Sequence, residues 1–537
     1  MSEIEVSKIK NLKNNIKLNL KSDGYIKKPV LYVKSRKELS CSFRMLPNQL
    51  SDRKVTFLIP AMKLSPTNLY YDIYLEFIDK DGESRQERVR TKSKLQRRLV
   101  NLLNLKHQLV RHEDKSYLIT GYFAVGGYLA FQVRETDQYD SLKYRMKELL
   151  ACVLVPFVYS YYKDSKLIYE KFSNYARDNS FYYFAYVQNN MQDNKLFYVI
   201  TKDSPDIENL KPYLKNTVYF MSVKHLMLIM VAKYFIASES KGHAYAWRHN
   251  QSIARYCLNR KPFVFLQHGV LGLKQVDKTF FANNRLNHAN LFITSSKIEK
   301  KIVLNFLGYQ EQNVAITGLA RWDNFKKLPK EKKMFVMPTW RVNLELLSDG
   351  EFLKSEFYRS YYSLLHSNKI KHLLYENGYT LHFMLHPKFV RFEKYFVSDD
   401  KNIKVVRQSD IPIDFELKTS KLVITDYSSI MWDALYYGCP ALLFQFDQAE
   451  YLQTQGSYLD FHSDLKEIIV KDPQTLLNKI ATFMQNQETI DLSSLQHKFF
   501  AYSDRSNSKR IGDSISQWEN DYQFVPLYKK YLTRFKR

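Results

Sequence analysis

The sequence predicts an α/β protein in which two Rossmann-like domains face a cleft, preceded by a smaller β-rich accessory domain. With 537 residues, the chain is too long for one hydrophobic core. From about residue 180 onward, short apolar runs alternate with longer amphipathic stretches, which is typical of βαβ units. A Lys-rich break at 326–333 interrupts the alternation, which then resumes, and this indicates two consecutive domains.

The first 135 residues have the pattern of the accessory domain. The expected strands there are Lys54–Pro60, Tyr70–Phe77 and Tyr128–Arg134, with turn signals at Asp81-Gly82 and Gly126-Gly127. The dense basic run Arg85–Arg98 is interpreted as a solvated loop, with a polyanion or lipid contact as the alternative. Residues 136–175 are expected to form a mainly helical connector to the remainder of the chain.

Two sets of candidate strands define the Rossmann-like domains, which we place at 176–325 and 326–489. The first set comprises Leu196–Ile200, Tyr234–Ala237, Phe263–Leu266, Leu291–Thr294 and Val314–Thr317. The second set comprises Met334–Met337, Thr380–Leu385, Ile403–Val406, Leu422–Thr425 and Ala441–Phe444. A basic helical tail is expected at 490–537, with the amphipathic basic segment YKKYLTRFKR.

The charge balance indicates anionic partners. The sequence holds 81 Lys and Arg residues against 55 Asp and Glu residues, a formal net charge of +26. Such an excess attracts nucleic acid, anionic lipid headgroups or an anionic substrate. Because neither a zinc-finger spacing nor an aromatic RNA-recognition signature is present, nucleic acid is not expected as a partner.

Cysteine and apolar patterns predict a reducing compartment and, at most, peripheral membrane contact. The cysteines Cys41, Cys152, Cys257 and Cys439 form no close pair, which favours free thiols over a disulfide framework or a metal site. The N-terminus lacks the apolar core of a signal peptide. The longest apolar run, Leu149–Tyr162, has about 14 residues and includes Pro156, whereas roughly 20 are needed to span a bilayer.

The clearest chemical motif is a strand-turn-helix unit at 421–447. A buried strand is followed by the turn Asp426-Tyr427-Ser428-Ser429, and a helix is expected from Ile430 to Tyr437. Ligands bind beyond the carboxyl ends of parallel strands, and the unpaired N–H groups of a helix start favour a phosphate. N-capping by a serine is the alternative explanation. The motif therefore predicts phosphate binding at Ser428 and Ser429.

Two histidines stand at the ends of predicted strands. An imidazole titrates near neutrality, so His268 suits a general base, and Gly269 beside it lets a substrate approach the backbone. His386 is the second cleft candidate. Four residues earlier on the same strand, His382 would stand about 13 Å away, so a metal shared by the two is not expected. We assign His382 a structural role.

Arginines at two further strand ends complete the predicted site. Arg341 closes the segment that starts the second domain, and Arg321 follows the last strand of the first domain, near the hinge. A planar guanidinium fits phosphate oxygens, although either arginine could instead form a salt bridge. Thr339, two residues before Arg341, is a further donor-binding candidate, as is Asp426. No metal ligand set is predicted, and a requirement for Mg²⁺ stays open.

Several well-known catalytic signatures are missing from the sequence. No P-loop, GxGxxG, HExxH or GxSxG pattern is present, which argues against nucleoside-triphosphate hydrolysis, zinc proteolysis and serine esterases. Histidines, arginines and a Ser-rich helix start at one cleft instead suit the binding of a diphosphate and the deprotonation of a hydroxyl.

Five ordered motifs resemble the CDP-glycerol glycerophosphotransferase family, which includes the teichoic acid glycerol- and ribitol-phosphate polymerases of Gram-positive bacteria. They are His268-Gly269, TGLARWD at 317–323, PTWR at 338–341, His386-Pro387 and TDYSSIMWD at 425–433. The resemblance covers roughly residues 165–485. It implies a GT-B-like fold and a peripheral enzyme at the cytoplasmic face of the cell membrane, acting in the biosynthesis of cell-wall teichoic acid.

The resemblance also implies a reaction and the roles of its residues. Glycerol phosphate, or another polyol phosphate, would pass from CDP-glycerol or CDP-ribitol to a lipid-linked polyol-phosphate acceptor at an anionic membrane surface, with release of CMP. His268 would deprotonate the acceptor hydroxyl, and His386 would stabilise the diphosphate or protonate the leaving group. Arg341, Ser428 and Ser429 would hold phosphates, and Asp426 would orient the donor site.

Two other classes of function stay open at this point. Because fold does not determine function, a nucleotide-sugar glycosyltransferase could use the same architecture. A membrane- or nucleic-acid-binding scaffold with a degenerate α/β core is the alternative that involves no catalysis.

Overall fold

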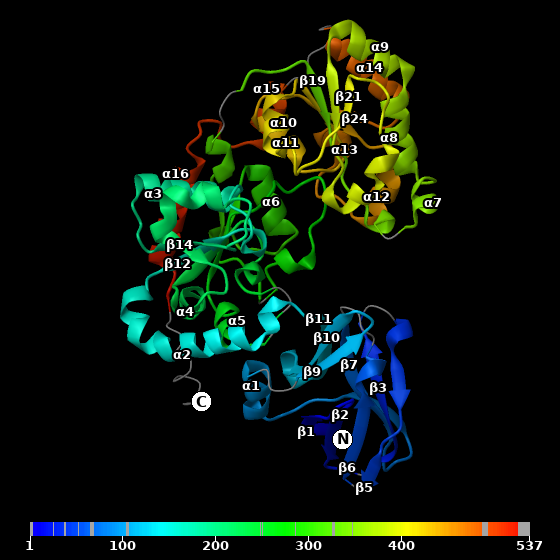
Figure 1. The fold of residues 1–537 in the computed structure, drawn as a ribbon, viewed down its shortest axis with the longest axis vertical. Helices are drawn as coiled ribbons and strands as arrows, with labels where there is room; N and C mark the ends of the chain where they lie inside the picture. Colours follow the sequence, from blue (N-terminus) through cyan, green and yellow to red (C-terminus); the bar gives the residue numbers. More distant parts are fainter. Residues whose placement is uncertain are drawn as a thin grey trace. The chain divides into compact units, whose positions relative to one another are not determined.

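The structure is a computed structural model and describes residues 4–24, 26–36, 39–51, 53–64, 69–103, 107–246, 249, 251–284, 286–324, 328–345, 347–485 and 492–524 (Figure 1). The segment YKKYLTRFKR therefore lies outside the described residues. The chain forms two compact units. The first comprises Met1–Asp164, Val218–Ala232 and Ala244–Arg260, and the second comprises Ser165–Thr217, Lys233–His243 and Lys261–Arg537.

Two antiparallel sheets form the N-terminal part of the first unit. One has the order β1-β2-β6-β5, formed by Ile4–Asn11, Asn15–Ser22, Lys54–Pro60 and Gln49–Ser51. The other has the order β4-β3-β7-β11-β10-β9, with β8 beside β7, and its strands are Phe43–Met45, Lys27–Ser35, Tyr70–Ile78, Leu129–Glu135, Lys115–Phe123, His107–His112 and Ser84–Arg88. Inward-facing apolar residues of both sheets share one core, which explains the alternating pattern in the sequence.

The basic run Arg85–Arg98 is not a loop, contrary to the prediction. Its first residues lie in β8, which pairs with β7, and its last residues lie in helix α1 (Lys94–Leu103). The pairing with β7 satisfies the backbone of a segment that its charge alone would leave in solvent.

Three helices complete the first unit: α2 (Leu142–Tyr162), α4 (Val223–Val231) and α5 (Ile253–Leu258). The carboxylate of Glu148 on α2 accepts hydrogen bonds from the Tyr245 hydroxyl and from the N–H of Ala254. Among the described residues, no helix combines the length and apolar character needed to cross a membrane.

The second unit begins with a parallel sheet of order β13-β12-β15-β16-β17-β18. Its strands are Leu196–Ile200, Lys166–Tyr169, Tyr234–Ala237, Phe263–Phe265, Leu291–Thr294 and Val314–Ile316. Helices α3 (Asn179–Asn190) and α16 (Asn507–Asp521) pack on one face, and α6 (Lys297–Asn305) lies between β17 and β18 in sequence. The short strand β14 (Thr217–Tyr219) contains a sequence boundary between the two units, since Thr217 belongs to the second unit and Val218 to the first.

A second parallel sheet follows, with the order β21-β20-β19-β22-β23-β24. Its strands are Ile403–Val405, Thr380–Phe383, Lys333–Val336, Leu422–Thr425, Ala441–Phe444 and Ile469–Val470. The helices of this part are α7 (Asp349–Phe352), α8 (Glu356–His366), α9 (Asn368–Asn377), α10 (Ile413–Thr419), α11 (Ile430–Tyr436), α12 (Gln448–Thr454), α13 (Phe461–Asp464), α14 (Pro473–Met484) and α15 (Leu492–Phe499).

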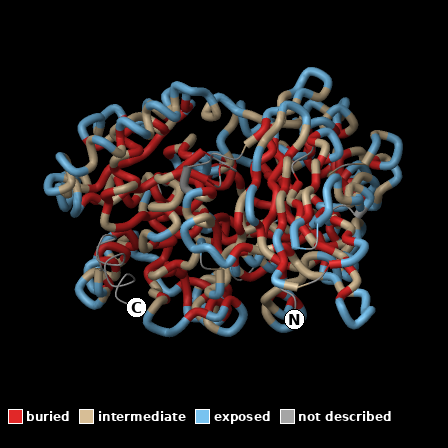
Figure 2. Tube along the Cα trace, turned by 90° about the horizontal axis from the view of Figure 1, so that it is seen from below, coloured by how far each residue is buried: buried red, intermediate tan, exposed pale blue. Residues whose placement is uncertain are grey.

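Each face of the second sheet has its own hydrophobic core. Helices α8, α9 and α14 cover one face, and α10, α11 and α15 contribute to the core on the other. Because both faces are covered, the strands are continuous apolar runs. Figure 2 shows buried residues in red through the interior and exposed ones along the outer turns.

All ten strands predicted for the two Rossmann-like domains are present, with ends that differ by no more than two residues. The prediction of a mainly helical connector at 136–175 is incomplete, because β12 lies within that range and pairs with both β13 and β15. The predicted helical tail contains α15 and α16, and α16 returns to pack against the first sheet.

The packing of α16 depends on a glycine after β18. Gly318 has a φ of 82°, and a Cβ there would stand 2.0 Å from Oδ1 of the buried Asn507. We expect Gly318→Ala to lower the free energy of unfolding by about 2–4 kcal/mol, through both backbone strain and the clash. Gly378→Ala is the matched control, because its φ is 66° and a Cβ meets no atom within 4 Å. Equal losses in chemical denaturation would contradict the proposed clash.

Candidate active site

The chain turns sharply after β16 and presents His268 at a pocket. Gln267 has a φ of 61°, in the left-handed region that side chains other than glycine rarely adopt. Its amide donates to the carbonyl of Ile293 at 2.6 Å and to Glu299 at 3.1 Å, and its carbonyl accepts a bond of 2.6 Å from Asn179. These buried contacts compensate the strained backbone and leave the His268 side chain exposed.

The loop beyond His268 is held by a buried carboxylate. Glu299 accepts hydrogen bonds from the N–H of Leu271 at 2.6 Å and from the N–H and hydroxyl of Ser295 at 2.6 and 2.8 Å. Burial raises the pKa of Glu299, and these bonds oppose the rise. Glu299 therefore connects the loop of His268 to the segment that follows β17.

The predicted phosphate-binding turn meets this loop. Ser428 Oγ accepts a long bond of 3.4 Å from the N–H of Ile430, whereas Ser429 makes no side-chain capping bond. A Cβ on Gly269 would lie 2.7 Å from Ser429 Oγ, so the two loops are in contact. Residues that follow β16 in the first sheet and β22 in the second are thus brought together.

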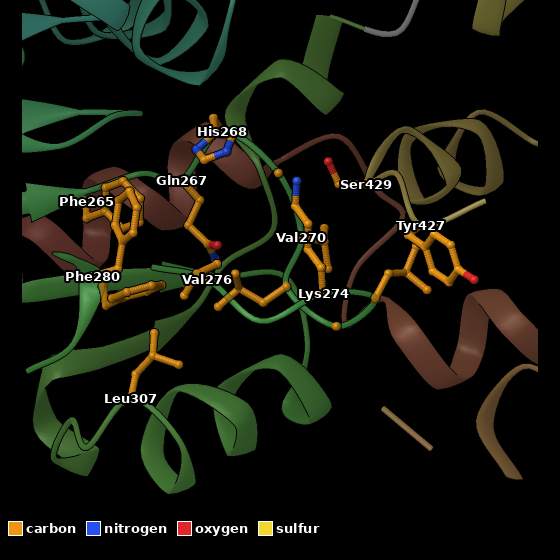
Figure 3. Close-up of a pocket in the computed structure, with 15 residues that line it drawn as sticks. Phe265, Gln267, His268, Val270, Lys274, Val276, Phe280, Leu307, Tyr427 and Ser429 are labelled. Atoms are coloured by element: carbon orange, nitrogen blue, oxygen red, sulfur yellow. The ribbon is translucent and has the colours of Figure 1, made fainter. Parts of the chain in front are cut away.

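Both loops line one pocket, which Figure 3 shows in close-up. Its polar side chains include those of Gln267, His268, Lys274, Tyr427 and Ser429. Its apolar side chains include Phe265, Val276, Phe280, Phe292 and Leu307. A mainly apolar pocket with a few converging polar groups is the usual form of a small-molecule site.

Arg341, Thr339 and Asp426 form a buried network at the ends of β19 and β22. Arg341 binds Asp426 at 2.9 Å and Asp447 at 2.7 Å, and it donates to the carbonyl of Thr339 at 2.7 Å. The N–H of Thr339 donates to Asp426 at 2.8 Å. Within the described residues, the buried hydroxyl of Thr339 has no hydrogen-bond partner. The guanidinium of Arg341 is therefore occupied by carboxylates, and the hydroxyl of Thr339 is not satisfied.

Arg321 is engaged in the same way. It forms a bidentate pair with Asp433, at 2.9 Å for both bonds, and it also binds Asp178 at 2.8 Å and the carbonyl of His268 at 2.7 Å. Trp322 Nε1 donates to the same Asp433 at 2.7 Å. The motifs around 317–323 and 425–433 are therefore bound to each other, and Arg321 anchors the backbone of His268.

His386 is half-buried between charged neighbours. Its Nδ1 accepts the N–H of Lys388 at 3.2 Å, which leaves Nε2 as the donor of a neutral ring. Burial, together with the ammonium groups of Lys274, Lys388 and Lys171, lowers the pKa of His386 to about 4. At neutral pH this side chain can donate a hydrogen bond but carries no charge. His382, by contrast, pairs with the buried Glu416 at 3.1 Å.

Sequence reasoning missed several charged residues of the site: Asp178, Lys274, Glu299, Asp433 and Asp447. Two of them lie close to predicted site residues. Lys274 is six residues after His268, and Asp433 is the last residue of the motif TDYSSIMWD. No local pattern distinguishes these from surface charges, because their partners come from elements far apart in the chain.

A group of metal-ligating side chains occurs in the first unit, where Asp137, Asp140 and His249 come close together. Asp140 forms a bidentate pair with Arg134, and its carboxylate also caps the turn begun by Asp137. His249 Nε2 lies 2.9 Å from Asp137. Hydrogen bonds within the protein account for all three side chains.

The pair of Arg321 and Asp433 can be tested by removing one partner. Asp433→Asn would remove one of the two carboxylates that compensate the largely buried guanidinium of Arg321 and break its bidentate pair, and we expect a loss of about 3–5 kcal/mol in the free energy of unfolding. Urea denaturation measures it. As the control, Glu393→Gln breaks the pair with Arg407, whose guanidinium is exposed, and should leave the denaturation midpoint nearly unchanged. If Asp433→Asn has the same denaturation midpoint as the control variant, the pair of Arg321 and Asp433 does not stabilise the fold.

Comparisons with known proteins point to one family. A profile described as CDP-Glycerol:Poly(glycerophosphate) glycerophosphotransferase matches residues 154–517. The minor teichoic acid biosynthesis protein GgaB of Bacillus subtilis (strain 168) is 27% identical over 368 residues, which are 64% of this chain and 39% of GgaB. The teichoic acid poly(ribitol-phosphate) polymerase of Bacillus spizizenii is 27% identical over 259 residues, 44% of this chain and 38% of the polymerase. This chain thus spans about two fifths of the length of these relatives.

The solved structures show a shared fold. A variant of the wall teichoic acid polymerase TagF superposes with a TM-score of 0.50 at 15% identity, over 71% of this chain and 99% of the TagF chain. The similarity is consistent with the mixed α/β architecture described above. Since the profile covers more than half of the sequence, the chain belongs to the CDP-glycerol:poly(glycerophosphate) glycerophosphotransferase family.

Proposed function

We propose that this protein transfers a polyol phosphate, glycerol phosphate in the first instance, from a CDP-linked donor to the terminal hydroxyl of a lipid-linked teichoic-acid-type or capsule polymer. CMP is the second product. In this proposal the two parallel sheets form a GT-B-like pair, with the acceptor bound beside the first sheet and the donor beside the second. Relatives of this chain include ribitol-phosphate polymerases, so CDP-ribitol is the alternative donor.

The observation that carries the proposal is the contact between the loop of His268 and the turn of Ser429. Gly269 lies so close to Ser429 that any side chain there would meet its hydroxyl. A base and a candidate phosphate-binding turn therefore border the same pocket. In-line phosphoryl transfer requires this geometry, because the attacking hydroxyl and the phosphorus must approach within a few ångströms.

The chemical step follows from this arrangement. His268 accepts the proton of the acceptor hydroxyl as its oxygen forms a bond to the polyol-bearing phosphorus of the donor. The bond from that phosphorus to the bridging oxygen breaks, and the electron pair leaves with CMP. His386, neutral at physiological pH, donates a hydrogen bond from Nε2 to a diphosphate oxygen.

We assign roles to the remaining candidates according to whether their hydrogen-bond donors already have partners in the protein. Ser428, Ser429 and the unsatisfied hydroxyl of Thr339 are proposed to hydrogen-bond phosphate oxygens. Arg341 and Asp426 are proposed to fix the floor of the donor site through each other, and Arg321 to position His268. In this view the arginines act on the phosphates through the groups they orient.

Donor turnover tests the proposal directly. The full chain is incubated with CDP-glycerol, CDP-ribitol or a UDP-sugar, together with a lipid-linked polyol-phosphate acceptor, and released nucleotide is measured. We expect CMP from one CDP-polyol and no release of UDP, and we expect His268→Ala to lower kcat by about 10²–10⁴-fold, the usual contribution of a general base.

His366→Ala serves as the matched control, because His366 is half-buried at the end of α8, stacks on Tyr362 and does not line the pocket. Absence of CMP with either CDP-polyol would refute the proposed reaction, and release of UDP would favour a glycosyltransferase. Full activity of His268→Ala would refute only the assigned base.

Helix α2 supports the further proposal that the protein binds the cytoplasmic face of the membrane peripherally. Large apolar side chains line one face of this helix and are exposed, Phe157 by 82%; they are Leu142, Met146, Leu149, Leu150, Val153, Phe157 and Tyr161. Their spacing of three or four residues makes a single continuous stripe. Lys143 and Lys147 follow one edge of the stripe, and Arg145 the other.

The charge of this surface selects an anionic bilayer over an apolar protein partner. Glu148, the acidic residue of α2, faces away from the stripe and is bonded to Tyr245 and Ala254. An apolar stripe between basic edges is the form of a helix that lies in a membrane interface, where apolar burial and attraction to acidic headgroups act together. The formal net charge of +26 adds to that attraction.

Vesicle flotation tests the lipid surface. The full chain should float with vesicles containing phosphatidylglycerol, less with phosphatidylcholine alone, and less again at high salt. We expect the double variant Val153→Ser, Phe157→Ser to weaken binding by at least about tenfold, given about 1.5–3 kcal/mol for each buried apolar side chain. Tyr375→Ser, which changes an exposed aromatic residue of α9, is the control. Unchanged flotation of the double variant would contradict the assignment, and a variant-sensitive dimer would identify the stripe as a subunit interface.

A further inference from the structure

We infer that Lys274 is the cation that neutralises the donor's diphosphate, a role for which no sequence motif selected it. The identity of the anion rests on the proposed function. The position and chemistry of the lysine are features of the structure alone.

The first argument is the location of Lys274. It lines the pocket that also contains His268, Gly269 and Ser429. In the view of Figure 3, its side chain extends toward Ser429, on the side of the pocket where His268 lies. Its charge is also felt by His386, whose pKa it helps to lower, and it interacts with Asp426. Lys274 therefore stands among the groups to which donor-binding roles have been assigned.

The second argument is that its charge is not paired. Within the part of the chain that the structure describes, Lys274 has no hydrogen bond and no ion pair. Asp426 is the carboxylate that acts on it, but the oxygens of Asp426 already accept from Thr339, Tyr427 and Arg341. Burial lowers the pKa of Lys274, and Asp426 opposes that effect.

The arginines of the site differ in this respect. Arg321 and Arg341 each bind two carboxylates and a backbone carbonyl. Their charges are already compensated, so an arriving diphosphate would have to compete with aspartates for them. An unpaired ammonium attracts the same dianion with no such competition.

The third argument is that the loop holding Lys274 is fixed on both sides of it. The carbonyl of Gly272 accepts the N–H of Tyr458 at 2.9 Å, and the N–H of Gln275 donates to the carbonyl of Gly456 at 3.2 Å. The N–H of Val276 donates to the hydroxyl of Tyr458 at 3.1 Å. Such bracing prepares a site before its ligand arrives, which reduces the entropy lost on binding.

An unpaired ammonium in a partly buried site works against folding, so a structural reason for it is lacking. A lysine kept for stability would have an acidic partner, as Lys333 has in Glu416. A lysine that serves ligand binding would lack an acidic partner in the protein, which lowers the stability of the fold, as is usual at functional sites. These two explanations predict opposite effects of removing the charge.

Calorimetric titration of the full chain with pyrophosphate, CDP and cytidine separates them. Lys274→Met keeps the length of the side chain and removes its charge. We expect it to weaken pyrophosphate and CDP binding by about 10- to 100-fold, to leave cytidine binding unchanged, and not to lower the melting temperature. Lys274→Arg should restore part of the loss. Lys278→Met, at an exposed position four residues further on, should behave as the wild type.

The outcomes are distinguishable from those of the proposed function. If Lys274→Met binds pyrophosphate and CDP as tightly as the wild type, or if the wild type binds neither, the inference is wrong. If it melts at a much lower temperature with binding otherwise intact, Lys274 is structural and the inference is also wrong. If pyrophosphate binding depends on Lys274 but neither CDP-polyol is turned over, the cation site stands and the proposed reaction fails.

Discussion

The bidentate pair between Arg321 and Asp433 is the interaction on which the arrangement of the site depends. Through one guanidinium, the segment after β18 is joined to helix α11, to Asp178 at the start of α3 and to the backbone of His268. Because the pair is largely buried, loss of Arg321 would leave the carboxylate of Asp433 uncompensated, and loss of Asp433 would leave Arg321 with Asp178 alone, so the geometry is strongly determined. The exposed imidazole of His268 therefore projects from a backbone segment that hydrogen bonds hold in place.

This constraint explains why the conspicuous arginines are not the open cations of the pocket. A guanidinium that must hold two elements together has its donors committed, and Arg341 repeats the arrangement with Asp426 and Asp447. Among the described residues, the ammonium of Lys274 at the pocket and the buried hydroxyl of Thr339 at the end of β19 have no hydrogen-bond partner. Polar groups without partners are rare in buried positions, and those at a pocket indicate where a ligand completes the bonding.

The extent to which the sequence predicts this molecule follows from the range of the interactions involved. Buried parallel strands such as Leu196–Ile200 and Ala441–Phe444 are local apolar runs, so their bounds could be read directly. The strand β12 is missed because it follows the end of helix α2 after only three residues, so its apolar run is assigned to the helical connector. That His268 and Ser429 follow strand ends could be predicted from the apolar runs before them, whereas the carboxylate partners of Arg321 lie more than 100 residues away in sequence and have no local signature.

The contrast between Lys274 and Lys333 shows how a charge can be interpreted once its surroundings are known. Lys333 is the first residue of β19 in the second sheet, and Lys274 lies in the loop that follows β16 of the first sheet. Lys333 contacts Glu416 and the hydroxyl of Thr419, so its charge is accounted for by the fold. Lys274 is braced by its neighbours along the chain, yet its ammonium has only a carboxylate that is already bonded to other groups. Since a folded chain gains nothing from such a charge, its place beside His268 and Ser429 is best explained by the anion that it would bind.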